Sequence, residues 1–292
     1  MSSNIGPDIR AQLLIFQKNE ITEHYIYQKL AQTTSSPENS DILIRISEDE
    51  KRHYDDWKKY TQASPAPDRF KIWFYYWVAR ILGLTFGIKL MERGEEAAQK
   101  NYAALFETIP EAEKMAQEEN DHENALIDLL DEERLQYTGS IVLGLSDALV
   151  ELTGALAGLT LALQNTRLIA LTGLITGIAA SFSMAASEYL STKSEESDKH
   201  PVRASLYTGL AYVITVLILV FPYLCLDNYF ICLFFTLMAA FLIIASFNFY
   251  ISVAKDLPFL PRFLEMAGLS SGVAALSFFI GWLIRAFLGV DV

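Results

Sequence analysis

The sequence has little of several features that mark common classes of protein. Its two cysteines, Cys225 and Cys232, form no pair with metal-ligand spacing, and so few cysteines exclude a disulfide-stapled scaffold. It has no block of Lys and Arg, and its net charge of −12 argues against nucleic acid as a partner. The first 20 residues lack the basic-then-apolar order of a secretory signal, so none is expected. An apolar content of 52% excludes a disordered chain.

Charge is distributed unevenly along the 292 residues. There are 16 Lys and Arg against 25 Asp and Glu before Thr138, and 7 against 10 from Thr138 onwards. The second part carries long uncharged runs instead, which excludes a wholly water-soluble globule. The chain is also roughly twice the usual domain length. We therefore expect an all-α protein of two domains, a water-soluble one at 1–137 and a membrane domain at 138–292.

Five apolar segments follow Tyr137. Each is long enough to cross a hydrocarbon core of about 30 Å, which takes about 20 helical residues. The expected spans are 139–163, 167–190, 204–224, 228–253 and 266–289. The connectors after the second and fourth spans carry most of the basic residues, namely Lys193, Lys199, Arg203, Lys255 and Arg262. The positive-inside rule then predicts a protein of the cytoplasmic membrane, with its N-terminal domain in the cytoplasm and its C-terminus outside.

Ionisable residues lie within these spans. Asp147 and Glu151 are four residues apart in the first span, hence on one helix face, and Met184 and Glu188 have the same spacing in the second. An ionisable side chain inside a membrane costs several kcal/mol unless it faces a partner or a water-filled path. Asp147, Glu151 and Glu188 are therefore candidates for a transport path, although Glu188 also fits a position at the cytoplasmic interface. One or two spans would have sufficed for an anchor.

The N-terminal domain is expected to contain four helices separated by turn signals. These are 8–33, ending at Thr-Thr-Ser-Ser-Pro; 38–62, ending at Ser-Pro-Ala-Pro-Asp; 70–108, stopped near Pro110; and a fourth from 111. No Pro or Gly separates the fourth from Gly139, so it could continue into the first span. The aromatic segment 70–90 fits either the core of the helix bundle or a belt against lipid headgroups, and the sequence does not choose between them.

Two copies of one pattern indicate a metal site. Glu50-Lys51-Arg52-His53 and Glu119-Asn120-Asp121-His122 are both Glu-x-x-His, which places carboxylate and imidazole on one helix face. One such motif on each of two helices, with a single Glu on each of the other two, is the ligand set of a di-iron carboxylate bundle. The candidate ligands are Glu20, Glu50, His53, Glu95, Glu119 and His122. This donor set suits iron, with manganese or zinc as alternatives.

Further carboxylates surround these candidates. They are Glu23, Glu92, Glu96, Glu118 and Glu123, and we interpret each as surface charge, with a role as extra ligand or supporting group left open. A supporting role is likewise left open for His24.

Both parts of the chain resemble known families. Residues 8–137 resemble the rubrerythrin branch of the ferritin-like superfamily, through Glu20 followed by Tyr27 and Leu30-Ala31, both Glu-x-x-His motifs, and Gly94-Glu95. Residues 139–290 resemble the vacuolar iron transporter family, through Gly144-Leu145-Ser146-Asp147 and the run from Ser183 to Ser191 that contains Met184 and Glu188. The combination is similar to the membrane-bound ferritins of prokaryotes, which are regarded as iron exporters. No rubredoxin-type cysteine domain is present, so rubrerythrin-like electron transfer is not implied.

The resemblance implies a role for particular residues. It places Asp147 and Met184 along a metal path at the axis of a homodimer. Thr176 stands where the family often has a Glu, and Glu151 is the candidate to replace it. The segment 192–202 is too short for the family's helical metal-binding insertion, so the ferritin-like domain would collect cytosolic metal instead.

The resulting prediction is a homodimeric transporter that exports Fe²⁺ from the cytoplasm in exchange for protons, with Fe²⁺, protons and membrane lipid as its partners. Two alternatives remain. The chain could be a membrane-tethered di-iron ferroxidase or peroxide-scavenging protein, which leaves enzymatic activity open. It could also transport manganese or a broad range of divalent metals.

Overall fold

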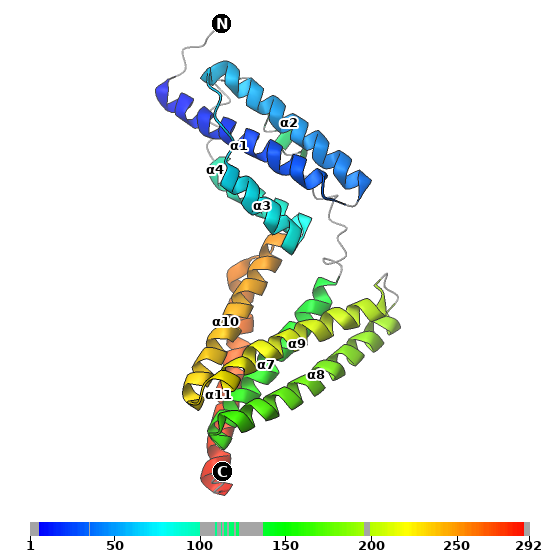
Figure 1. Cartoon of the computed structure of the whole chain (residues 1–292), viewed down its shortest axis with the longest axis vertical. Helices are drawn as coiled ribbons and strands as arrows, with labels where there is room; N and C mark the ends of the chain where they lie inside the picture. Colours follow the sequence, from blue (N-terminus) through cyan, green and yellow to red (C-terminus); the bar gives the residue numbers. More distant parts are fainter. Residues whose placement is uncertain are drawn as a thin grey trace. The chain divides into compact units, whose positions relative to one another are not determined.

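The computed structural model describes residues 6–34, 36–99, 109, 112, 114–115, 117–119, 121–122, 137–195 and 199–288, without the side chains of 95–99 and 288. Regular structure in these ranges is entirely helical. The chain divides into two compact units, Met1–Glu132 and Glu133–Val292, both drawn in Figure 1.

The first unit is built on an antiparallel pair of helices, α1 (Pro7–Ala31) and α2 (Pro37–Thr61). Each begins with a proline in its first turn, where the missing N–H costs nothing, and the Ser36 hydroxyl caps α2 by accepting the Asn39 N–H. Both helices lie within two residues of their predicted bounds. Their shared core includes Ile26, Leu30, Leu43 and Ile46.

The prediction of one helix over 70–108 is wrong. The structure has α3 (Arg69–Leu82) and α4 (Leu84–Gln99), separated at Gly83. Gly83 has φ 109° and ψ 151°, a conformation essentially restricted to glycine, so the chain changes direction there. A single glycine in a helical pattern usually only weakens the helix, which is why the sequence did not reveal the break. The predicted end at Thr108 lies outside the described residues.

A short helical segment within 112–122 completes the described part of this unit. Ile109, Ala112 and Met115 pack against Leu13, Phe16 and Trp57, which ties the segment to α1 and α2. The predicted continuation into the first membrane span would involve 123–136, which are outside the described residues.

In 137–195 and 199–288, the described ranges of the second unit, the structure has five apolar helices. They are α7 (Thr138–Leu163), α8 (Thr166–Ser194), α9 (Pro201–Cys225), α10 (Tyr229–Ala254) and α11 (Phe259–Leu288). All five are long and apolar enough to cross a membrane, which confirms the five predicted spans. The fifth begins earlier than predicted, at Phe259 instead of residue 266. The chain is an integral membrane protein in which α7 contacts each of the other four spans.

Helices α7 and α9 approach each other closely at Gly144. A Cβ on Gly144 would overlap the carbonyl oxygen of Thr208, and the neighbouring Thr208 hydroxyl donates to the Ser140 carbonyl at 2.9 Å. We expect Gly144→Ala to destabilise this unit by about 1–3 kcal/mol, because backbone cannot move aside cheaply. Thermal unfolding in detergent measures the effect. Gly268→Ala is the control, since open space surrounds Gly268, and equal stability of the two variants would contradict this account.

Candidate metal centre

Four side chains of the first unit converge on one buried point. They are Glu20 from α1, Glu50 and His53 from α2, and Glu119 from the last helical segment. One ligand atom from each lies within 4.8 Å of all the others. Glu20, Glu50 and His53 are 5%, 1% and 0% exposed, so three of the four are almost fully withdrawn from water.

The two Glu-x-x-His motifs face each other reciprocally. His53 Nδ1 lies 3.1 Å from Glu119 Oε1, and His122 Nδ1 lies 3.3 Å from Glu50 Oε1. Each Nδ1 also lies near the carboxylate of its own motif. His53 Nδ1 is 3.8 Å from Glu50 Oε2, and His122 Nδ1 is 3.9 Å from Glu119 Oε2. The imidazole rings stack with centroids 6.0 Å apart. The repeat in the sequence therefore becomes an approximate two-fold arrangement of donors.

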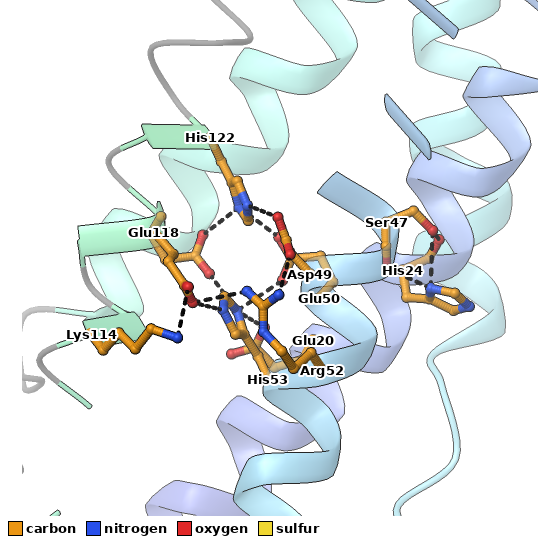
Figure 2. Close-up of polar contacts among 11 residues, drawn as sticks. Glu20, His24, Ser47, Asp49, Glu50, Arg52, His53, Lys114, Glu118 and His122 are labelled. Atoms are coloured by element: carbon orange, nitrogen blue, oxygen red, sulfur yellow. Dashed lines mark hydrogen bonds and ion pairs between the residues drawn. The ribbon is translucent and has the colours of Figure 1, made fainter. Parts of the chain in front are cut away.

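A second carboxylate holds each imidazole from outside (Figure 2). His53 Nε2 donates to Glu118 Oε2 at 2.9 Å, and His122 Nε2 donates to Asp49 Oδ2 at 3.0 Å. Asp49 and Glu118 each directly precede the Glu of the opposite motif. Because Nε2 is engaged in this way, Nδ1 of each ring is left facing the centre, which is how outer carboxylates orient ligating histidines.

The inward-facing atoms lack the hydrogen bonds that burial requires. Glu20 Oε2, Glu50 Oε2, His53 Nδ1 and His122 Nδ1 are buried without a hydrogen-bond partner in the described part of the chain. Each buried polar atom without a partner lowers the stability of the fold by about 1–3 kcal/mol. A convergent set of such atoms therefore indicates a binding site for a ligand. The other oxygen of Glu20 is fixed by the Trp57 indole N–H at 3.1 Å. The donors match those of an iron or manganese site, and the cluster could bind a metal ion.

The electrostatics of the cluster depend on the close contact of carboxylates and imidazoles. Burial and the nearby Glu119 carboxylate raise the pKa of Glu50 well above its usual value. Burial alone would lower the pKa of both histidines, but the carboxylates outweigh it, raising the pKa of His53 strongly and that of His122 to about 10. The two nearby histidines lower the pKa of Glu119 to about 2 despite its burial.

These pKa shifts predict proton release on metal binding. Without metal, both histidines have a raised pKa and hold their protons at pH 7. A metal ion at Nδ1 must displace those protons, so we expect affinity to rise with pH between 6 and 9 and protons to enter the buffer. Calorimetry in buffers of different ionisation enthalpy measures the release. Affinity that does not change over this range would contradict the assignment of Nδ1 as ligand.

Glu118 is held by more than one partner. It accepts from His53 and pairs with Arg52 Nη2 at 3.0 Å and Lys114 Nζ at 3.3 Å. Although burial alone would raise the pKa of Glu118, these contacts lower it to about 2. The carboxylate therefore stays ionised as an acceptor for the imidazole.

Removal of the outer carboxylates is expected to weaken metal binding without removing a ligand. We expect Glu118→Ala and Asp49→Ala each to raise the metal Kd by about 10–100-fold, because the imidazole loses its orientation. Titration with Fe²⁺ or Mn²⁺ under anaerobic conditions measures this. The exposed Glu48, on the same helix as Asp49, provides the control variant Glu48→Ala. An effect of Glu48→Ala equal to that of Asp49→Ala would show that loss of acidic charge, not orientation, is responsible.

The structure brings five of the six predicted ligands together. The sixth, Glu95, belongs to α4, but its side chain lies outside the described residues, so its role stays a prediction. Glu118 contacts the cluster, whereas His24 contacts Ser47, with Nδ1 2.7 Å from the Ser47 carbonyl. Sequence reasoning missed Asp49 and Trp57. The acidic residue before the Glu of each motif was a signal that could have revealed Asp49.

The candidate path residues lie on α7 and α8 of the second unit. Asp147 is half-buried on α7, and Glu151, one turn further on, is exposed and accepts the Tyr212 hydroxyl at 3.1 Å. Glu188 on α8 accepts the Ser140 hydroxyl at 2.5 Å. Met184 is partly buried against the apolar core of this unit. Tyr212 and Ser140 could not be predicted as partners, because each lies on a different helix from the carboxylate that it contacts.

A cavity of about 420 Å³ opens beside Glu151. Its polar lining comes from Glu151, Thr172, Thr176, Tyr212 and Ser277. Glycines such as Gly154 and Gly158 leave the space open along α7. Thr176 and Glu151, which come from different helices, therefore line the same space.

The first two spans are similar in sequence to a known family. Residues 138–199 match the VIT family. The matched VIT-family segment comprises α7, α8 and the start of the connection to α9, and it contains all four candidate path residues. No curated protein matches the chain.

Proposed function

We propose that this protein exports Fe²⁺ from the cytoplasm in exchange for protons, and that its ferritin-like N-terminal unit captures the ion. The observation that carries the proposal is the coexistence, in one chain, of a buried Glu/His cluster and a VIT-family segment with ionisable residues inside its spans. The cluster accounts for capture, and the spans account for passage.

Capture rests on the reciprocal donors around Glu50 and Glu119. Each of these carboxylates lies within 4 Å of both imidazoles, so it can bridge two ions, as in di-iron bundles. Glu20 adds a donor on the His53 side, 3.5 Å from His53 Nδ1. Glu95 on α4 is the proposed sixth ligand.

Passage rests on Asp147, Glu151 and Met184. Asp147 and Glu151 offer oxygens to Fe²⁺, and the Met184 thioether adds a soft, polarisable ligand. The related family often has a Glu at the position of Thr176. Glu151 lines the same cavity as Thr176, so it can supply a carboxylate there instead. A carboxylate that releases the cation can take up a proton from the far side, and this couples metal export to proton entry.

A second copy of the chain completes the path. Glu151 is exposed in one chain although it belongs to a membrane span. A carboxylate facing lipid would be costly, so this surface of α7 is covered by the same surface of a partner in a homodimer. The small residues along α7, including Gly154, Ala155 and Gly158, allow such close approach.

Export as the direction rests on a cytoplasmic N-terminal unit, and the basic connectors support that placement. Lys193 lies in the last turn of α8, Lys199 in the α8–α9 connection and Arg203 in the first turn of α9. Lys255 and Arg262 lie near the α10–α11 connection. The positive-inside rule assigns them to the cytoplasm, and two spans separate the first connector from the N-terminal unit, which is therefore on the same side.

Membrane vesicles of defined sidedness test the direction. Inside-out vesicles that contain the protein should accumulate Fe²⁺, faster when their lumen is acidic, while right-side-out vesicles should not. Accumulation only in right-side-out vesicles would make the protein an importer. Competition by Mn²⁺ in the same assay distinguishes an iron transporter from a broad divalent transporter.

The buried cluster also favours a second candidate, a membrane-tethered ferroxidase or peroxide scavenger. In that case Fe²⁺ is oxidised at the cluster and the spans mainly anchor it. Oxygen or peroxide consumption that requires Fe²⁺, Glu50 and His53, without flux into liposomes, would favour this candidate.

A further inference from the structure

Helix α3 exposes an aromatic face. Five of its large side chains are exposed on this face: Phe70 (70%), Trp73 (56%), Phe74 (38%), Trp77 (47%) and Ile81 (63%). Their spacing of three, four, seven and eleven residues from Phe70 places all five on one side of the helix. The sequence allowed two interpretations of this segment, the core of the bundle or a belt against lipid headgroups. Because these five side chains are exposed, the segment does not serve the core alone.

The opposite side of α3 is fixed to the first unit. Ile72 and Ala79 are buried in the core shared with α1, α2 and α4, where they pack with residues such as Ile26 and Met91. Tyr75 and Tyr76 pack beside them. The orientation of the aromatic face is thus determined by packing, and the face does not result from a loosely attached helix.

Charge on α3 is of one sign. Arg69, Lys71 and Arg80 are its only ionisable side chains besides the two tyrosines, in a chain whose net charge is −12. By helical spacing, Arg69 and Arg80 flank the aromatic face on one side and Lys71 on the other. The N-cap carboxylate of Asp68 accepts the Phe70 and Lys71 N–H groups and pairs with Lys18 at 3.3 Å, so it is already engaged.

We propose that α3 lies in the headgroup region of the bilayer, with its aromatic face toward the acyl chains and its basic residues on anionic phospholipid. Trp and Phe on one face with Lys and Arg beside them are the composition of interfacial helices, and Trp prefers this depth. The five spans of the same chain keep α3 close to a membrane, so docking is an intramolecular event.

A second copy of the chain fits this surface less well. A two-fold contact through the aromatic face would bring the three basic residues of one α3 toward those of the other, and like charges oppose such a contact. Anionic headgroups complement the same residues. The cytoplasmic leaflet, where we place this unit, carries such lipids.

Tryptophan quenching in the full-length protein tests the proposal. The chain has four tryptophans; Trp57 is fully buried, and Trp282 lies on α11. Two variants are compared in nanodiscs whose lipids are brominated near the headgroup. One carries Trp282→Phe alone, and the other carries Trp73→Phe and Trp77→Phe in addition. The difference between their spectra is the emission of Trp73 and Trp77, and Phe preserves the apolar face.

In nanodiscs with anionic lipid, we expect the bromolipids to quench most of the emission of Trp73 and Trp77, which the difference spectrum reports. The emission of Trp57 should not change. Lys71→Gln with Arg80→Gln should reduce the quenching, since each basic charge contributes roughly five-fold to binding at an anionic surface. The control, Arg45→Gln with Lys58→Gln on α2, should have no effect. Difference emission that is not quenched, or is quenched equally without anionic lipid, would overturn the proposal. So would protection of Trp73 and Trp77 only in discs that hold two chains, because a second copy would then cover α3.

Discussion

Replacement of Asp147 by alanine is expected to reduce metal flux to the level of protein-free liposomes while the N-terminal unit keeps its bound metal. Asp147 is half-buried on α7, in the VIT-family segment and one turn from Glu151. If it forms part of the path, its loss removes an oxygen ligand from the membrane interior, where water cannot replace it. Flux is measured with an Fe²⁺-sensitive dye inside the liposomes, and bound metal by elemental analysis.

Asp227→Ala is the matched control for this variant. Asp227 is exposed in the connection between α9 and α10, outside the spans, so its removal should leave flux unchanged. Flux in Asp147→Ala equal to that of the unchanged protein would exclude the proposed path. Loss of bound metal in the same variant would mean that the change acts through the fold.

The second large effect is expected at the cluster. The double variant Glu50→Ala with His53→Ala should lose its high-affinity metal, because it removes one ligand pair and the partner of Glu118. Metal should then no longer stabilise the first unit. A ligand at 100 times its Kd stabilises by about 2.7 kcal/mol, and this increment should vanish in the variant.

Thermal unfolding with and without Fe²⁺ or Mn²⁺ measures this increment, with the exposed Glu48 again providing the control. Flux at saturating metal should persist in the double variant, since the spans are unchanged, whereas flux at low metal should fall. A metal-dependent rise in unfolding temperature that survives in the double variant would place the metal site elsewhere.

The sequence predicted the elements whose signals are local. Segment length and hydropathy predict the five membrane helices. A spacing of three residues places the Glu and the His of each motif on one helix face. The break at Gly83 was missed because its cause is a backbone conformation, φ 109°, that no local pattern announces. Interactions between helices were also missed. Asp49 binds the imidazole of His122, 73 positions away, and Tyr212 binds Glu151 from 61 positions away.

The aromatic segment shows what a structure adds to composition. Core packing and lipid contact require the same residue types, so Phe70 to Leu90 was ambiguous. Only the packing of Ile72 and Ala79 determines which side of α3 points outward, and that side carries Trp73 and Trp77.

Fe²⁺ flux through the full-length protein in liposomes, measured with and without a pH gradient and alongside metal bound per chain, tests the central claim most directly. The account predicts bound metal together with flux into the vesicles, accelerated when their interior is acidic. Bound metal without flux would contradict it, reduce the five spans to an anchor, and assign the function to chemistry at the Glu/His cluster.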